Sequence, residues 1–261
     1  MQINNINTIP LVILAGGFGT RISEETTTIP KPMIEIGGIP IIIHIMNYYS
    51  KFGVNKFIIC AGYKAKVIKE YFYSLTYSQS DLEFNLKDKK ISYLTKNKKN
   101  WEIKIVETGI NTMTGGRMKK ILKYIKSDNF FMTYGDGLSD VNIDSLYKLH
   151  LKQKKIATVT AVKPASRFGY LKINKYNLVK KFEEKPINDD WINGGFFILN
   201  KKIYKYIKNS KTIFEKEPLE FLSQKKQLIA FKHKGFWQPM DTLRDKKVLE
   251  KIWISKTVPW L

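Results

Sequence analysis

The sequence of 261 residues has the length of one large domain, and a hydrophobic content of 43% is enough for a buried core and argues against disorder. The formal net charge of +22 would suit nucleic acid, an anionic membrane or phosphorylated substrates, but the lysines are spread along the chain and no nucleic-acid-binding signature occurs. We expect no signal peptide, because the first residues hold no basic stretch followed by a long apolar run, and no apolar run reaches the ~20 residues that span a bilayer. With a single cysteine, Cys60, no intrachain disulfide forms. We expect a cytoplasmic protein without a membrane or nucleic-acid partner.

The first half of the chain predicts strands that alternate with helices. Residues 11–15 (LVILA) are apolar on both faces, as in a parallel strand covered by helices on both sides. Apolar residues at helical spacing follow at 40–53, then a second buried strand at 56–62 and a second helix at 63–72. This β-α-β-α order predicts an α/β fold with right-handed crossovers.

Further along, two short alternating runs within 82–107 predict an inserted hairpin. The remaining pattern predicts a helix from 114, strands at 129–137 and 155–162, a helix at 142–154, and several short strands within 167–199. We expect a Rossmann-like mixed, mostly parallel sheet flanked by helices, with the inserted hairpin and a small β-rich C-terminal part. One domain would span 1–261, with about 10–165 as its core and about 166–261 as the smaller part.

A glycine-rich loop, AGGFGTR, follows the first strand at residues 15–21. It is not a P-loop, because no Gly-Lys-Ser/Thr ends it, and Ile22 stands where the dinucleotide fingerprint needs its third glycine. Its glycines nevertheless let backbone N–H groups approach an anion, and Arg21 adds a fork for phosphate oxygens. The residues alone leave an anion cradle and a structural turn both open.

A lysine between two prolines, Lys31, lies ten residues after Arg21. The prolines hold its backbone stiff, so that its ammonium group is aimed at one place. A surface lysine in a proline-rich loop is the competing interpretation.

Two aspartates are candidate ligands of Mg²⁺. Asp136 follows a buried strand between two glycines, and Asp241 lies in GFWQPMDT. Magnesium bound with phosphates needs only one or two protein carboxylates. The competing interpretations are a β-turn for Asp136 and the N-cap of the following helix for Asp241.

A fourth motif, EEKP at 183–186, is followed by WINGG at 191–195. Its carboxylate, lysine and amide side chains are suited to a sugar and its phosphate, whereas the competing interpretation is an exposed charged turn. The three histidines are isolated, so neither a zinc site nor a Ser-His-Asp arrangement is indicated.

In serial order, AGGFGTR, PKPM, TGGR, YGDG, FGYL, EEKP and INGGFF resemble the sugar-phosphate nucleotidyltransferases over residues 11–253. The segments SEET, MTGGR and FWQPMDTLRDK are similar to the branch that transfers a cytidylyl group. The resemblance implies a Mg²⁺-dependent reaction of CTP with α-D-glucose 1-phosphate to CDP-glucose and pyrophosphate, for cell-surface polysaccharide such as O-antigen. Two alternatives remain: an enzyme of the same fold with another phosphorylated acceptor or another NTP, and a non-catalytic RNA-binding protein.

The resemblance also implies the site residues. Arg21, Lys31 and Asp136 would be catalytic, and Asp136 and Asp241 would hold Mg²⁺. The sugar phosphate would be bound by Gly169, Glu184, Lys185 and Asn193. The nucleotide would be bound by Leu14, Ala15, Gly16, Gly17, Phe18, Gly19, Thr20, Arg21, Lys31, Thr112, Arg117 and Gly135, with Arg117 as the residue that discriminates cytosine. The first part of the domain would thus bind the nucleotide and the second the sugar phosphate.

The family further implies a homo-oligomer such as a hexamer, and the exposed apolar end TVPWL is a candidate contact. Three departures from the family pattern occur at Ile29, at Trp191 and within 164–171. The last two lie on the expected sugar side, so they leave the reaction class intact and the identity of the sugar phosphate open.

Overall fold

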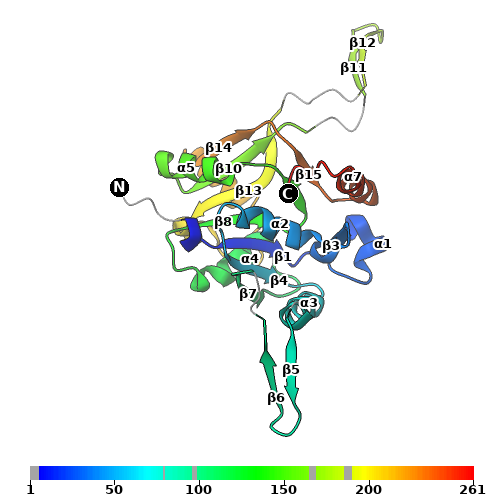
Figure 1. Ribbon diagram of the computed structural model, residues 1–261. Coiled ribbons are helices and arrows are strands. Elements are labelled where there is room, and N and C mark those ends of the chain that lie inside the picture. The colour runs from blue at the N-terminus through cyan, green and yellow to red at the C-terminus, as the bar shows by residue number, and fades with distance from the viewer. Residues whose placement is uncertain (1–5, 79, 96–98, 165–168, 185–189) are drawn as a thin grey trace.

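The computed structural model describes residues 6–78, 80–95, 99–164, 169–184 and 190–261. Its centre is a seven-stranded sheet of order β14-β10-β13-β8-β1-β4-β7 (Figure 1). The strands are β1 (Leu11–Ala15), β4 (Lys56–Ala61), β7 (Glu102–Glu107), β8 (Asn129–Tyr134), β10 (Ala157–Val162), β13 (Ile192–Asn200) and β14 (Leu228–His233). Only the pairs of β13 with β8 and β10 are antiparallel, so the predicted mixed, mostly parallel sheet is confirmed.

Strand β1 lies inside the sheet and is buried along its whole length. Because side chains alternate across a strand, Leu11 and Ile13 enter one hydrophobic cluster while Val12 and Leu14 enter the other. A continuous apolar run therefore has a partner on each face, as helix-covered parallel strands require.

Helices cover both faces of the sheet. One face packs on α2 (Ile41–Ser50), α3 (Ala65–Ser78), α5 (Ile143–Gln153) and α7 (Leu243–Ile254). The other packs on α4 (Thr114–Ile121), α6 (Glu217–Gln224) and the 3-10 helices η4 (Leu122–Tyr124) and η5 (Lys201–Tyr206). The remaining short helices are η1 (Ile6–Thr8), η2 (Thr20–Ile22), α1 (Ser23–Thr26) and η3 (Lys31–Met33). No helix in the described part of the chain is long and apolar enough to cross a membrane.

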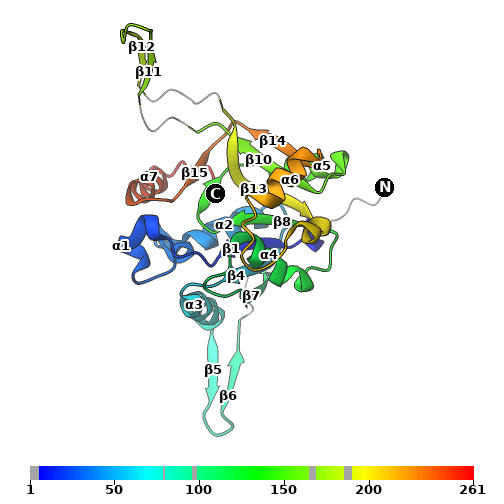
Figure 2. The same ribbon diagram turned by 180° about the vertical axis from the view of Figure 1, so that it is seen from behind.

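Within the described residues, four two-stranded ribbons accompany the sheet. Two are short pairs, β2 (Glu35–Ile36) with β3 (Ile39–Pro40) and β9 (Gly137–Ser139) with β15 (Trp237–Pro239). Two are hairpins, β5 (Leu82–Asn85) with β6 (Lys90–Tyr93) and β11 (Tyr170–Ile173) with β12 (Val179–Glu183). The hairpins project from opposite ends of the body (Figures 1 and 2).

The prediction of one hairpin over 82–107 is only half right. Residues 82–93 form the hairpin, but 102–107 are β7, which pairs in parallel with β4 at the edge of the main sheet. An edge strand is only partly covered, and the residues inside β7 are half-buried. Its alternating pattern is therefore the same as that of a hairpin strand, and periodicity could not separate the two.

The expectation of an exposed C-terminal contact is wrong for its largest side chain. Trp260 is only 1% exposed, its ring packs 5.4 Å from that of Phe236, and its indole N–H donates to His44 Nδ1 at 3.2 Å. The indole is stable inside the core because its ring makes apolar contacts there and its N–H has a hydrogen-bond acceptor.

Candidate active site

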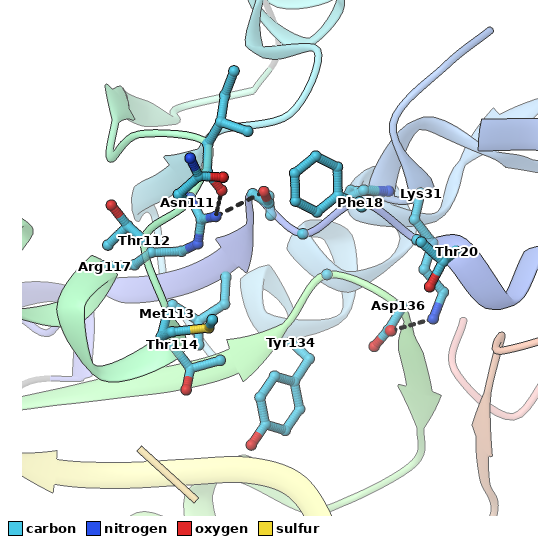
Figure 3. Close-up of a pocket in the computed structure, with 18 of the residues that line it drawn as sticks. Phe18, Thr20, Lys31, Asn111, Thr112, Met113, Thr114, Arg117, Tyr134 and Asp136 are labelled. Atoms are coloured by element: carbon cyan, nitrogen blue, oxygen red, sulfur yellow. Dashed lines mark hydrogen bonds and ion pairs between the residues drawn. The ribbon is translucent and has the colours of Figure 1, made fainter. Parts of the chain in front are cut away.

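A cavity of about 470 Å³ opens at the carboxyl ends of β1 and β8, the edge at which open α/β sheets bind ligands (Figure 3). Every residue that the sequence assigned to the nucleotide lines it. The lining consists of Leu14, Ala15, Gly16, Gly17, Phe18, Gly19, Thr20, Arg21, Lys31, Pro32, Ile110, Asn111, Thr112, Met113, Thr114, Arg117, Tyr134, Gly135 and Asp136. Arg117 and Thr112 lie at one end, and Lys31 and Asp136 lie at the other.

The glycine-rich loop is held by the guanidinium group of Arg117, which reaches it from α4. Arg117 Nη2 donates to the carbonyl oxygens of Gly16 at 2.8 Å and Ile110 at 3.1 Å, and Nη1 donates to Thr108 Oγ1 at 2.6 Å and to the Gly109 carbonyl at 2.9 Å. Arg117 is only 4% exposed, and burial lowers its pKa, although a guanidinium remains charged in proteins.

Gly16 makes this contact possible, because a Cβ atom there would lie 2.0 Å from Arg117 Nη1. Gly19 has a φ of +69°, which only glycine adopts at low cost. The shape of the loop is therefore fixed by one close approach and one left-handed residue, and its role as an anion cradle stays a prediction. Both Nη atoms of Arg117 donate to protein acceptors. A contact between Arg117 and the base of a nucleotide stays a prediction.

Two cations and two carboxylates meet at the other end of the cavity. Lys31 Nζ lies 2.6 Å from Asp136 Oδ2 and 2.7 Å from Asp241 Oδ1, and Arg21 Nη1 lies 2.6 Å from Asp241 Oδ2. Lys31 is 8% exposed, so its interpretation as a surface lysine is wrong. The structure thus brings together four residues from three distant parts of the sequence.

The backbone explains how Asp241 reaches this cluster. Helix α7 begins with Thr242 as its N-cap, in a capping box with Asp245. Asp245 Oδ2 accepts the backbone N–H groups of Asp241 and Thr242, at 3.1 and 2.9 Å, and Met240 N–H donates to the Asp136 carbonyl at 2.8 Å. The capping interpretation of Asp241 is therefore wrong, and its carboxylate is directed at Lys31.

The chemistry of this donor set fits a divalent cation bound together with phosphates. Two carboxylates, Asp136 and Asp241, converge on one positively charged group. Over the described ranges no group of three or more His, Cys, Asp and Glu side chains is placed to hold a metal ion by itself. Magnesium commonly takes one or two carboxylates and completes its shell with phosphate oxygens and water.

Tyr134 and Glu215 form a further polar pair that sequence reasoning missed. Tyr134 lines the cavity, and its hydroxyl donates to Glu215 Oε1 at 2.6 Å, while Thr114 Oγ1 donates to Glu215 Oε2 at 2.6 Å. Burial and the nearby Glu215 carboxylate raise the pKa of Tyr134, which therefore stays protonated. Tyr134 lies in the motif YGDG, so a signal was present for it, whereas Glu215 lies in none of the motifs that the sequence analysis singled out.

The expected sugar-phosphate residues are not gathered in one place. Asn193 lies at the start of β13 with its Nδ2 3.5 Å from the Tyr134 hydroxyl, next to the cavity. Gly169 and Glu184 are exposed at the base of the β11–β12 hairpin and do not line the cavity. Lys185 lies outside the described residues.

The sequence is similar to that of known nucleotidyltransferases over nearly its whole length. The sequence model of a family described as nucleotidyl transferase matches residues 11–245. The chain is 49% identical to the glucose-1-phosphate cytidylyltransferase of Salmonella typhimurium over 251 residues, 95% of this chain and 97% of that protein. It is 40% identical to a probable glucose-1-phosphate cytidylyltransferase of Bacillus subtilis over 250 residues, 95% of this chain and 98% of that protein.

Solved structures agree with the fold. The chain is similar to HddC from Yersinia pseudotuberculosis, with a TM-score of 0.69 and 26% identity, over 94% of this chain and 99% of that one. A UDP-glucose pyrophosphorylase solved with UDP-glucose matches with a TM-score of 0.67 at 19% identity, over 95% of this chain and 99% of that one.

Proposed function

The chain belongs to the nucleotidyl transferase family, and from that premise we propose that it joins CTP to α-D-glucose 1-phosphate, giving CDP-glucose and pyrophosphate. The observation that carries this proposal is the 49% identity, over nearly the whole of both chains, with a glucose-1-phosphate cytidylyltransferase. CDP-glucose would serve the synthesis of cell-surface polysaccharide such as O-antigen, and we place the reaction in the cytoplasm, where CTP is available.

The nucleotide would lie along the cavity with its base at one end and its phosphates at the other. The backbone of residues 14–19 would hold the base, ribose and phosphates, because glycines let N–H groups come close to phosphate oxygens. Thr112 and Arg117 would meet the base. Arg21 and Lys31 would meet the phosphates, since these are the cations at the opposite end.

The chemical step needs positioning and charge neutralisation rather than a covalent intermediate. A phosphate oxygen of glucose 1-phosphate attacks the α-phosphorus of CTP, and the bond from that phosphorus to the β-phosphate oxygen breaks, so that pyrophosphate leaves. No proton moves, because the attacking oxygen is already ionised. Arg21 would neutralise the leaving pyrophosphate, and Lys31 would neutralise the reacting phosphates.

Asp136 and Asp241 would hold Mg²⁺ in this enzyme. The ion supplies charge neutralisation on the transferred and leaving phosphates. Asp136 sits on the turn after β8, and Asp241 is fixed by the hydrogen bond from its backbone N–H to Asp245. The backbone positions of both aspartates would therefore be fixed before substrate binds.

Glu184, Lys185, Gly169 and Asn193 would bind glucose 1-phosphate. Glu184 and Gly169 lie on an outlying hairpin, so their participation requires that hairpin to approach a cavity, either of the same chain or of a second copy. A two-stranded hairpin is marginally stable alone, and β11–β12 exposes large apolar side chains such as Tyr176 (76%) and Phe182 (63%). These features support a homo-oligomer such as a hexamer, and sedimentation of the purified protein tests it.

The test of the function is a panel of nucleotides and sugar phosphates. The purified protein is mixed with Mg²⁺, one NTP and one sugar 1-phosphate, and pyrophosphate release is followed. We expect the highest kcat/KM for CTP with glucose 1-phosphate. Turnover with UTP and none with CTP would overturn the nucleotide assignment, and a preference for another sugar phosphate would overturn the acceptor.

The RNA-binding alternative receives no support from the relatives. It requires RNA affinity that falls steeply with salt and survives loss of Arg21 and Lys31. A binding titration of RNA against the Arg21→Gln and Lys31→Gln variants distinguishes it from the enzyme, whose activity both variants would reduce.

A further inference from the structure

The Lys31 ammonium occupies the space between the two carboxylates that would ligate a metal. Its Nζ is 2.6 Å from Asp136 Oδ2 and 2.7 Å from Asp241 Oδ1. The second oxygen of Asp241 is occupied as well, because it lies 2.6 Å from Arg21 Nη1. In this arrangement both oxygens of one carboxylate and one oxygen of the other already have a charged partner.

The charges at this end of the cavity balance. Two carboxylates face one ammonium and one guanidinium, so that the site as it stands has no excess negative charge to attract a divalent cation. A cation that approached the carboxylates would also meet the Lys31 ammonium at close range, and like charges repel strongly where water is partly excluded. The Lys31 side chain is only 10% exposed, which limits screening.

The two cations can leave the carboxylates by different routes. The Arg21 side chain is 70% exposed, so it can turn toward a ligand in the cavity at little cost. Lys31 carries its ammonium on a flexible stem whose backbone is fixed by Pro30 and Pro32. Both residues line the cavity, where the phosphates of a bound nucleotide would offer several anionic oxygens in charge-assisted hydrogen bonds.

We propose that Lys31 and Arg21 keep Asp136 and Asp241 closed to divalent cations in the free enzyme, and that the triphosphate of the incoming nucleotide opens them. Metal ion and nucleotide then enter the site together, and metal binding to the free enzyme is weak. This inference rests on the proposed function only in naming a nucleoside triphosphate as the ligand that draws the two cations away.

The experiment measures Mn²⁺ binding to the full chain in the absence of nucleotide and sugar phosphate, from the electron paramagnetic resonance signal of free Mn²⁺. We expect weak binding by the wild type and binding at least about tenfold tighter by Lys31→Met, because one positive charge has been removed beside the two carboxylates. The double variant Lys31→Met/Asp136→Asn should lose that gain. Lys148→Met, which breaks an exposed ion pair with Asp144, is the matched control and should bind as the wild type does.

Arg21→Gln keeps the test decisive if Lys31→Met does not fold. Arg21 is exposed, so this variant should fold as the wild type does and should bind Mn²⁺ more tightly than the wild type, by a smaller factor. A folded Lys31→Met or Arg21→Gln with wild-type Mn²⁺ affinity overturns the proposal. The titration contains no substrate, so its result does not depend on which nucleotide or sugar the enzyme uses.

Discussion

Replacing Gly16 with alanine would place a methyl carbon 2.0 Å from Arg117 Nη1 and 2.4 Å from Arg117 Cζ. The guanidinium group cannot move aside cheaply, because it is buried and donates to the Gly16, Gly109 and Ile110 carbonyls and to Thr108 Oγ1. The methyl group therefore either displaces the guanidinium from its acceptors or pushes the loop away from α4.

Overpacking of this kind costs about 1–3 kcal/mol, and a lost hydrogen bond to a charged group costs a similar amount. We expect Gly16→Ala to lower the free energy of unfolding by about 2–4 kcal/mol. In a protein of this size the change corresponds to a fall in Tm of about 4–16 °C. Thermal unfolding followed by circular dichroism measures it, and the KM for nucleotide should rise in parallel because the loop lines the cavity.

The neighbouring glycine provides a matched control. A Cβ atom on Gly17 meets nothing within 4 Å, so Gly17→Ala should leave Tm within about 1 °C of the wild type. Its methyl group would still occupy ligand space, because Gly17 lines the cavity, and KM should rise without loss of stability. Equal Tm values for the two alanine variants would refute the claim that Arg117 clamps the loop.

Three further outcomes are expected. Asp136→Asn should lower kcat at least about 100-fold with little change in Tm, because Lys31 keeps its ion pair with Asp241, whereas Asp144→Asn should be neutral in both assays. Trp260→Ala should destabilise by about 3–5 kcal/mol in urea unfolding, whereas Leu261→Ala, at an exposed site, should have an effect below about 0.5 kcal/mol. Burial lowers the pKa of His150 in the folded protein to about 4, from 6.5 for an exposed histidine. As the pH falls below 6.5, the unfolded chain therefore binds a proton before the folded protein does. The contribution of His150 to the free energy of unfolding is full above pH 6.5 and is lost progressively toward pH 4. His150→Gln should therefore lose about 2 kcal/mol less than the wild type between pH 7 and pH 5.

The nucleotide-binding part of the site could be predicted because it depends on short motifs at the ends of two strands. Glycines and a cation after the first strand, and Asp136 after a later one, had to share a sheet edge once both strands were recognised as buried and parallel. The sequence also held the answer to the Asp241 ambiguity: Thr242 followed three residues later by Asp245 is the pattern of a capping box. That pattern places the cap one residue after Asp241 and leaves its carboxylate available.

Other features depended on contacts that no local pattern encodes. Glu215 meets Tyr134 across a separation of 81 residues, and the pairing depends on how the segment before α6 packs against Thr114 of α4. We expected Trp260 to be exposed because a short apolar tail has no periodicity from which its packing partners could be predicted. The position of the β11–β12 hairpin relative to the cavity is equally non-local, so the sugar-binding residues stay a prediction.

The contact between Trp260 and His44 also bears on how the chain folds during synthesis. The two residues are 216 positions apart, and the face of α2 that carries His44 is completed by Trp260 and by Trp253 of α7. On the ribosome, this face of α2 emerges early and lacks part of its native cover until Trp253 and Trp260 have followed. Until then the nascent chain exposes apolar surface of the kind that chaperones bind, so the yield of folded protein should depend more on chaperone supply than the stability of the finished fold would suggest.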